Sequence, residues 1–106
     1  MYVYVDLSSQ PPTVTLEEPQ DCGRFHVAAR GGRSEPGLAA ALVAAGVGRG
    51  AGDGHAAVAV DAVRRLAGGR VGPTWDADFE AMLSYASGKG WLSPDGNAIT
   101  AHVEWT

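Results

Sequence analysis

Apolar and polar residues alternate along four stretches of the chain: residues 2–7, 13–17, 24–30 and 99–105. A period of two is typical of strands with one apolar and one polar side. In the last stretch, Ile99, Ala101, Val103 and Trp105 share the apolar side. Short links between the first three stretches favour an antiparallel meander.

Three further stretches have the spacing and end signals of helices. The clearest follows Thr74, whose hydroxyl can cap the first turn, and ends at Gly88. Its large apolar residues are four, three and four positions apart and share one face: Trp75, Phe79, Met82 and Ala86. We expect a second helix with Ser34 or Glu35 as its cap and Pro36 in its first turn, which continues through the alanine- and leucine-rich residues 38–45. The third should span residues 55–67, after Asp53 as N-cap.

The expected order is three strands, three helices and a final strand in a single domain of residues 1–106. Runs of strands followed by runs of helices are typical of the α+β class. Because each strand has only one apolar side, we expect a mostly antiparallel, four-stranded sheet with the helices packed on one face. The last strand should pair with one of the first three, and we favour a place beside the N-terminal strand.

Glycine occupies every second position from 46 to 54. This stretch fits neither the G-x-G-x-x-G nor the G-x-x-x-x-G-K-[ST] pattern of phosphate-binding loops. We therefore interpret it as a flexible connection between two helices, because glycine has high conformational freedom. Anion capture by Arg49 at the start of the next helix is the alternative.

Composition narrows the classes of function. The net charge is −4 and the basic residues are not clustered, which argues against nucleic-acid binding. No apolar run approaches the roughly 20 residues of a membrane span, and the N-terminus lacks a signal-peptide pattern. We expect a cytoplasmic protein without membrane association. The single cysteine, Cys22, excludes an internal disulfide and a cysteine-rich zinc site.

The polar side of the expected sheet carries the candidate chemistry. Its acid–base candidates are His26, His102 and Glu104. His102 and Glu104 would lie about 7 Å apart on one strand, a spacing that metal ligands also use. Two residues do not by themselves establish a metal site, so we expect no metal and no cofactor. A divalent-metal protein that uses His102, Glu104 and His26 is a further alternative. The candidate ligand-binding residues, for a small polar or anionic ligand, are Tyr4, Arg24, Arg30 and Arg49.

No catalytic motif accompanies these residues. The leading interpretation is therefore a small soluble binding or interaction module of unknown ligand. Tyrosine and arginine are favoured at protein interfaces, so we expect a homodimer through the sheet face or its edge. The alternative is a small lyase, isomerase or hydrolase that uses His26, His102 and Glu104 on a small polar substrate. The sequence leaves open whether the protein is an enzyme.

The last third of the chain carries one extended pattern. It reads Trp75-x3-Phe79-x2-Met82-x3-Ala86, then Gly90-Trp91, then Ala98-x2-Ala101-His102-Val103-Glu104-Trp105. This pattern resembles the C-terminal end of a family of small uncharacterised actinobacterial proteins. The resemblance implies no activity, cofactor or partner.

Overall fold

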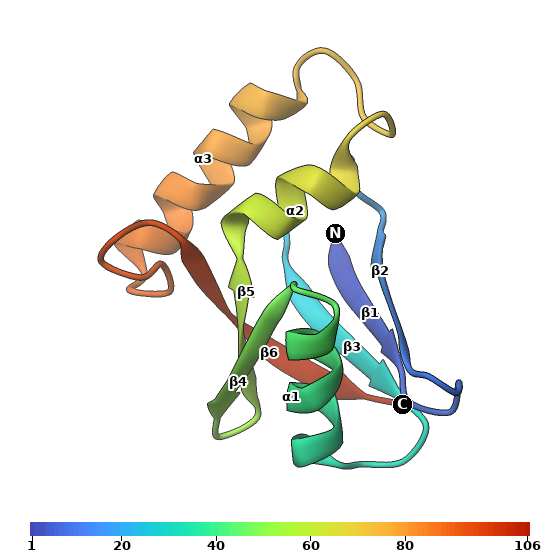
Figure 1. Ribbon diagram of the computed structural model, residues 1–106. Helices are drawn as coiled ribbons and strands as arrows, with labels where there is room; N and C mark the ends of the chain where they lie inside the picture. The colour runs from blue at the N-terminus through green and yellow to red at the C-terminus, as the bar shows by residue number, and fades with distance from the viewer.

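Six strands form one mixed sheet in the computed structural model, which describes residues 1–106 (Figure 1). The strands are β1 (Tyr2–Asp6), β2 (Thr13–Glu17), β3 (His26–Arg30), β4 (Gly48–Gly52), β5 (His55–Ala59) and β6 (Ala98–Trp105). Their order across the sheet is β2-β1-β3-β6-β5-β4. Strand β3 is parallel to both β1 and β6, and the other neighbours are antiparallel.

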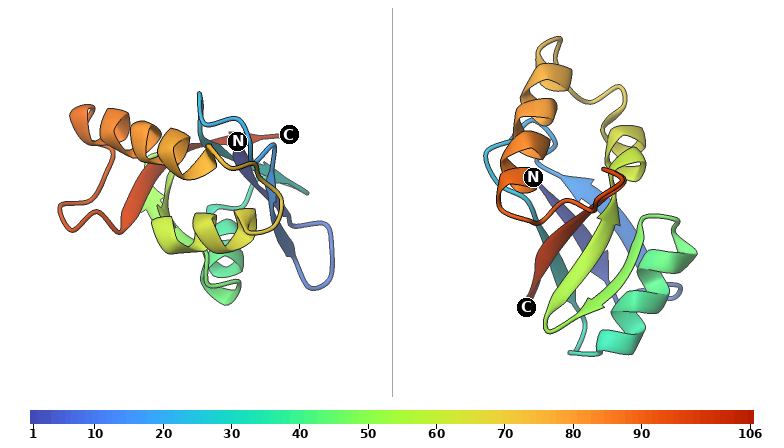
Figure 2. Two further views of the ribbon diagram at one scale, coloured as in Figure 1. Left: turned by 90° about the horizontal axis from the view of Figure 1, so that it is seen from above. Right: turned by 90° about the vertical axis from the view of Figure 1, so that its left-hand side faces the viewer.

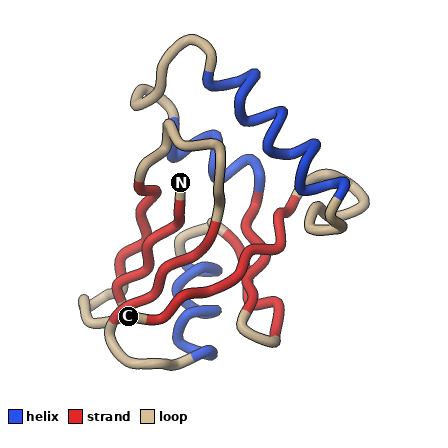
Figure 3. The backbone as a smooth tube through the Cα atoms, turned by 180° about the vertical axis from the view of Figure 1, so that it is seen from behind, coloured by secondary structure: helices blue, strands red, loops and turns tan.

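Three helices complete the fold: α1 (Glu35–Ala44), α2 (Val60–Ala67) and α3 (Trp75–Gly88). Helices α1 and α2 lie on one face of the sheet, and α3 lies toward one end of it (Figures 1 and 2). Seen from behind, the strands lie in front of α1 and α2, and no helix crosses them (Figure 3). We call these two sides of the sheet the covered face and the open face. The predicted α+β class is confirmed.

The core fills the space between the covered face and the helices. Along β6 the buried residues are Ile99, Ala101 and Val103, which alternate with exposed ones as the sequence predicts. Strands β1, β2 and β3 follow the same rule, because a strand directs successive side chains to opposite faces. The largest fully buried side chains are Phe79, Met1, Leu16, Leu42, Val3, Val5, Val27, Val47, Val58 and Val63.

The predicted four-stranded, mostly antiparallel sheet is wrong in the number and direction of its strands. Strand β3 does not continue a meander beside β2. The chain crosses the start of β1 between residues 18 and 25, so β3 lies on the far side of β1 and parallel to it. The Met1 ammonium group donates to the Asp21 carbonyl oxygen at 3.0 Å and ties this crossing to β1. The last strand, β6, pairs with β3, which confirms the prediction that it joins one of the first three strands. The favoured place beside β1 is wrong.

The glycine-rich stretch is an edge hairpin, not the flexible helix connection that we predicted. Asp53 and Gly54 have φ angles of 52° and 76° and form the tight turn between β4 and β5. Two consecutive residues with positive φ match the twist of a hairpin, and Asp-Gly is a preferred pair for this turn. Asp53 is therefore a turn residue and does not cap a helix.

The helix predicted over residues 55–67 is wrong in its first part, which is a strand. Residues His55–Ala59 form β5, and α2 begins only at Val60. Ala56 and Val58 are fully buried on the covered face, opposite Ala101 and Ile99 of β6. Pairing on both edges decides the conformation of this stretch, because a short run of alanine and valine has no strong preference between helix and strand.

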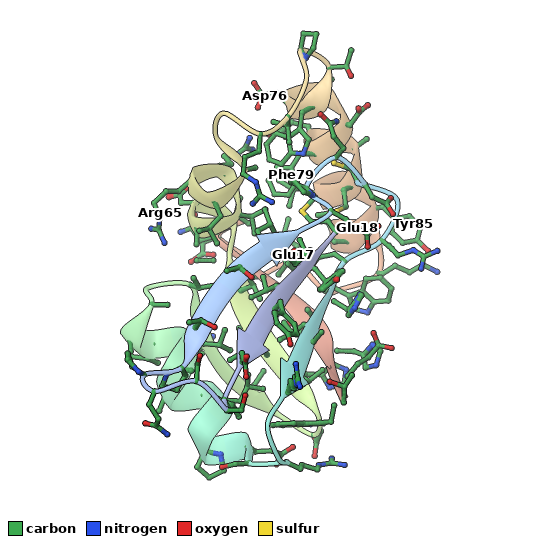
Figure 4. All side chains as sticks on the ribbon, turned by 90° about the vertical axis from the view of Figure 1, so that its right-hand side faces the viewer. Glu17, Glu18, Arg65, Asp76, Phe79 and Tyr85 are labelled. Carbon is green, nitrogen blue, oxygen red and sulfur yellow. The ribbon has the colours of Figure 1, made fainter.

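Helix α3 is confirmed with the buried face that its spacing predicts, although Met82 is only partly buried and Leu83 takes part in that face. Figure 4 shows Phe79 directed into the domain and Tyr85 directed away from it. The indole of Trp75 donates to the Pro19 carbonyl oxygen at 2.6 Å and links α3 to the crossing between β2 and β3. None of the three helices has the length and apolar character to cross a membrane.

Candidate ligand-binding groove and polar sheet face

The polar residues of β1, β3 and β6 lie on the open face. Tyr2 is opposite His26 across β1 and β3, and Ala28 is opposite Glu104 across β3 and β6. Since paired residues in neighbouring strands share a face, these side chains all lie on one side of the sheet. The alternation of the sequence predicts this arrangement within each strand, and the strand order brings the strands together.

The side chains of His26 and Glu104 are in contact on this face. His26 Nε2 lies 2.9 Å from Glu104 Oε2. The ring of Tyr2 stacks on the imidazole of His26, with 5.0 Å between the ring centroids and 17° between the planes. The His26 side chain is 22% exposed and that of Glu104 51%, so the pair is accessible from solvent. The third acid–base candidate, His102, lies on the same face, is exposed and pairs with His55 of β5.

The four candidate ligand-binding residues do not gather at one place. Tyr4 lies half-buried on β1, and Arg30 lies at the end of β3 opposite Asp6. Arg49 is exposed on the edge strand β4. Arg24 lies just before β3, and its Nε is 4.0 Å from Asp21 Oδ2. Arg24 lines the groove beside α3, and none of the four lines the small cavity between α1 and the β4–β5 hairpin.

A groove of about 540 Å³ lies between α3, the segment before β3 and the start of β6. The sequence analysis did not predict it. Eight of its twelve lining residues are hydrophobic. The lining residues are Cys22, Gly23, Arg24, Phe25, Asp78, Ala81, Met82, Tyr85, Ala86, Trp91, Ile99 and Thr100. A concave apolar surface of roughly 300–1,000 Å³ with a few polar groups is the usual form of a small-molecule site.

Two exposed aromatic side chains are part of the groove. Tyr85 is 61% exposed and Trp91 45%, and their rings meet edge to face at 6.0 Å. The ammonium group of Lys89 lies 5.5 Å from the Tyr85 ring centroid. Large aromatic surface that a fold leaves in contact with water, beside a cavity, is typical of a binding site.

The local backbone holds Trp91 in place. Gly90 has a φ of 78°, which turns the chain sharply after α3. The Trp91 N–H then donates to the Ala86 carbonyl oxygen at 2.8 Å, and its own carbonyl oxygen accepts from Thr100 N–H at 2.7 Å. The indole is therefore attached to a backbone fixed to both α3 and β6.

Cys22 contributes a thiol to the groove. Burial raises the pKa of this thiol above its ordinary value, and the nearby Asp78 carboxylate raises it further. The thiol is therefore protonated at neutral pH, and only a thiolate is strongly nucleophilic. Cys22 is a soft, weakly polar part of the lining and does not act as a nucleophile.

The groove opens at one end of the open face. Thr100 lines it and shares the polar side of β6 with His102, and Phe25 lines it immediately before His26. The His26–Glu104 pair itself lies outside the groove. No three side chains of histidine, cysteine, aspartate or glutamate are grouped so that they could hold a metal ion.

Comparison of the chain with protein-family models, curated proteins and solved structures finds no match in any of the three. The resemblance to the actinobacterial family therefore stays a prediction.

Proposed function

We propose that the protein is a small-molecule binding module whose ligand occupies the groove beside α3. The observation that carries this proposal is the 540 Å³ apolar groove with Tyr85 and Trp91 exposed in it. Exposing two aromatic rings costs hydrophobic stabilisation, and that cost is offset when a ligand covers them.

The charged residues of the lining are Arg24 and Asp78, and we infer a ligand with a flat apolar body and one anionic group that lies against Arg24. The rings of Tyr85 and Trp91 suit a flat body, because aromatic groups pack well edge to face and offset-stacked. The Arg24 side chain is 77% exposed, and its Nε lies as far as 4.0 Å from Asp21 Oδ2. Because this contact is loose, the guanidinium group has donors left for an anion. The sequence analysis expects a small polar or anionic ligand, and the proposed ligand belongs to the anionic kind.

Titration with 8-anilinonaphthalene-1-sulfonate, a flat aromatic sulfonate, tests the proposal. We expect a saturable rise in dye fluorescence with one site per chain. The substitution Ala81→Trp should weaken dye binding roughly tenfold or more, because an indole at this exposed position fills the groove. Arg24→Ala should weaken it less, since the rim arginine contributes only the contact with the sulfonate.

The matched control is Ala40→Trp, which places an indole on an exposed position of α1, away from the groove. We expect this variant to bind the dye as the unchanged protein does. Dye binding that does not saturate, or that is reduced equally by the two tryptophan substitutions, would contradict a ligand site in the groove.

The enzyme alternative has narrower support. It is favoured by the 2.9 Å contact between His26 and Glu104, because a carboxylate that orients an imidazole is a common acid–base arrangement. It also requires that these residues and His102 converge in a concave pocket. Neither the groove nor the small cavity between α1 and the β4–β5 hairpin is lined by any of the three. The binding module is therefore the better-supported function.

The homodimer expected from the sequence is a further proposal. The open face carries Tyr2, Tyr4 and Arg30 with no helix over it, which leaves room for a second copy. We expect sedimentation velocity at high micromolar concentration to give the mass of a dimer. Tyr4→Glu should return the mass to that of one chain, and a monomer in the unchanged protein would contradict the proposal.

A further inference from the structure

All three histidines of the chain lie in one row across the open face. His55 of β5 is directly opposite His102 of β6. On the other side of β6, Val27 is opposite Val103, so His26 and His102 are the preceding residues of two parallel strands. The sequence places these histidines far apart, and only the strand order β3-β6-β5 brings them into one row.

The pair His55–His102 has the close spacing of a non-hydrogen-bonded pair. The Val103 N–H donates to the Gly54 carbonyl oxygen at 2.8 Å, which makes Gly54 and Val103 the hydrogen-bonded neighbours. Pairs of the two kinds alternate along an antiparallel ladder, and in the non-hydrogen-bonded kind the Cα atoms are about 4.5 Å apart with the side chains close together. Both imidazoles are exposed.

The backbone orients the imidazole of His55. Its Nδ1 lies 2.9 Å from the Asp53 carbonyl oxygen. A carbonyl oxygen can only accept, so this contact places a proton on Nδ1, and in the neutral tautomer with that proton Nε2 has the free lone pair. Histidines that bind metals usually donate their other ring N–H to such a carbonyl oxygen. Asp53 belongs to the tight turn of the hairpin, which gives this contact a rigid base.

We propose that His55 and His102 form a binding site for a divalent transition-metal ion. Imidazole nitrogens suit copper, nickel and zinc, and the Irving–Williams order puts Cu²⁺ first. His26 is not part of the site, because β3 lies two strands away from His55 of β5 and the His26 Nε2 atom contacts Glu104. With two protein ligands, the remaining positions on the metal go to water. This site is separate from the groove and reverses the expectation of no metal.

Calorimetric titration of the tag-free full chain with CuCl₂, NiCl₂ and ZnCl₂, each metal alone, tests the site. We expect one ion per chain, with Cu²⁺ bound most tightly. His55→Ala and His102→Ala should each weaken Cu²⁺ binding roughly tenfold or more, since each removes one of two ligands. His26→Ala is the matched control, and its affinity should stay within about twofold of the unchanged protein.

Imidazole ¹⁵N chemical shifts give a readout that needs no variant. On addition of ZnCl₂ we expect the largest change at Nε2 of His55 and at one ring nitrogen of His102, with a smaller change at His26. The proposal is overturned if binding does not saturate, if either single variant binds as tightly as the unchanged protein, or if His26→Ala weakens binding as much as His102→Ala does. The last result would place the ion between His26 and His102 instead.

Discussion

The substitution Phe79→Ala is expected to lower the free energy of unfolding by about 3–5 kcal/mol. Phe79 has no exposed surface, and its ring stacks on Trp75 with 4.7 Å between the centroids. On its other side the guanidinium group of Arg64, from α2, lies 4.9 Å from the ring centroid. Removing the ring leaves a cavity where α3 meets α2.

Urea denaturation followed by circular dichroism measures this effect. Tyr85→Ala is the matched control, because it removes a ring of similar size from the same helix at a position that is 61% exposed. We expect the control to change the free energy of unfolding by less than about 0.5 kcal/mol while it weakens dye binding. Equal losses of stability in the two variants would mean that Phe79 does not hold α3 to the domain.

Phe79 matters because the other links between α2 and α3 are at the surface. Arg64 Nη2 donates to Glu80 Oε1 at 2.5 Å and Arg64 Nη1 lies 3.9 Å from Asp76 Oδ1, but both carboxylates are mostly exposed. Exposed ion pairs contribute little, about 0–1 kcal/mol. The position of α3, and with it one wall of the groove, therefore depends on the buried rings of Phe79 and Trp75.

The elements with strong periodicity could be predicted from the sequence. The spacing of Trp75, Phe79 and Ala86 fixes α3, and the alternation from Ile99 to Trp105 fixes β6, because both patterns persist over several periods. The β4–β5 hairpin was missed for a specific reason. Aspartate is common both at helix N-caps and in tight turns, so Asp53 alone does not distinguish the two. Alternating glycines are compatible both with a flexible connection and with a glycine-rich strand.

The alternation of apolar and polar residues within each strand does not determine the order of the strands in the sheet. Val3, Val27 and Val103 are core residues in either an antiparallel or a parallel sheet, so alternation cannot tell which strands are neighbours. Alternation predicts that His26 and Glu104 share the polar side of the sheet. Their 2.9 Å contact follows from the parallel pairing of β3 with β6, which alternation does not predict.

The groove could not be predicted from the sequence for a similar reason. Its walls come from segments before β3, along α3 and at the start of β6, and these meet only through the tertiary fold. The spacing did contain one signal. Tyr85 lies three positions after Met82 but off the buried face, and Trp91 follows Gly90, just after the end of α3. Both aromatic rings were therefore candidates for exposure.

The second large effect is expected from Gly48→Ala, which should lower the free energy of unfolding by about 3 kcal/mol. A Cβ atom at Gly48 would lie 2.2 Å from the Ala57 carbonyl oxygen and 3.1 Å from the Val58 Cα. Both are backbone atoms of β5, which pairs with β4 on one edge and β6 on the other. They cannot move aside as a flexible side chain would, so the substitution must separate β4 from β5.

Gly88→Ala is the control for this experiment. A Cβ atom there has no neighbour within 4 Å, and Gly88 is the last residue of α3 with an ordinary negative φ. We expect this variant to be neutral or more stable by up to about 1 kcal/mol, because alanine favours a helix more than glycine does. Urea denaturation of both variants measures the difference between a glycine that the packing requires and one that it does not.

The stability of the Gly48→Ala variant also tests whether the glycine-rich stretch is a paired edge strand or a flexible connection. A flexible connection would accept alanine at position 48 at little cost, whereas a paired edge strand would not. If the hairpin loosens, the pair His55–His102 loses the partner strand on its outer side. Gly48→Ala should therefore weaken Cu²⁺ binding as well as lower stability, while Gly88→Ala, at the far end of α3, should leave the metal site unchanged.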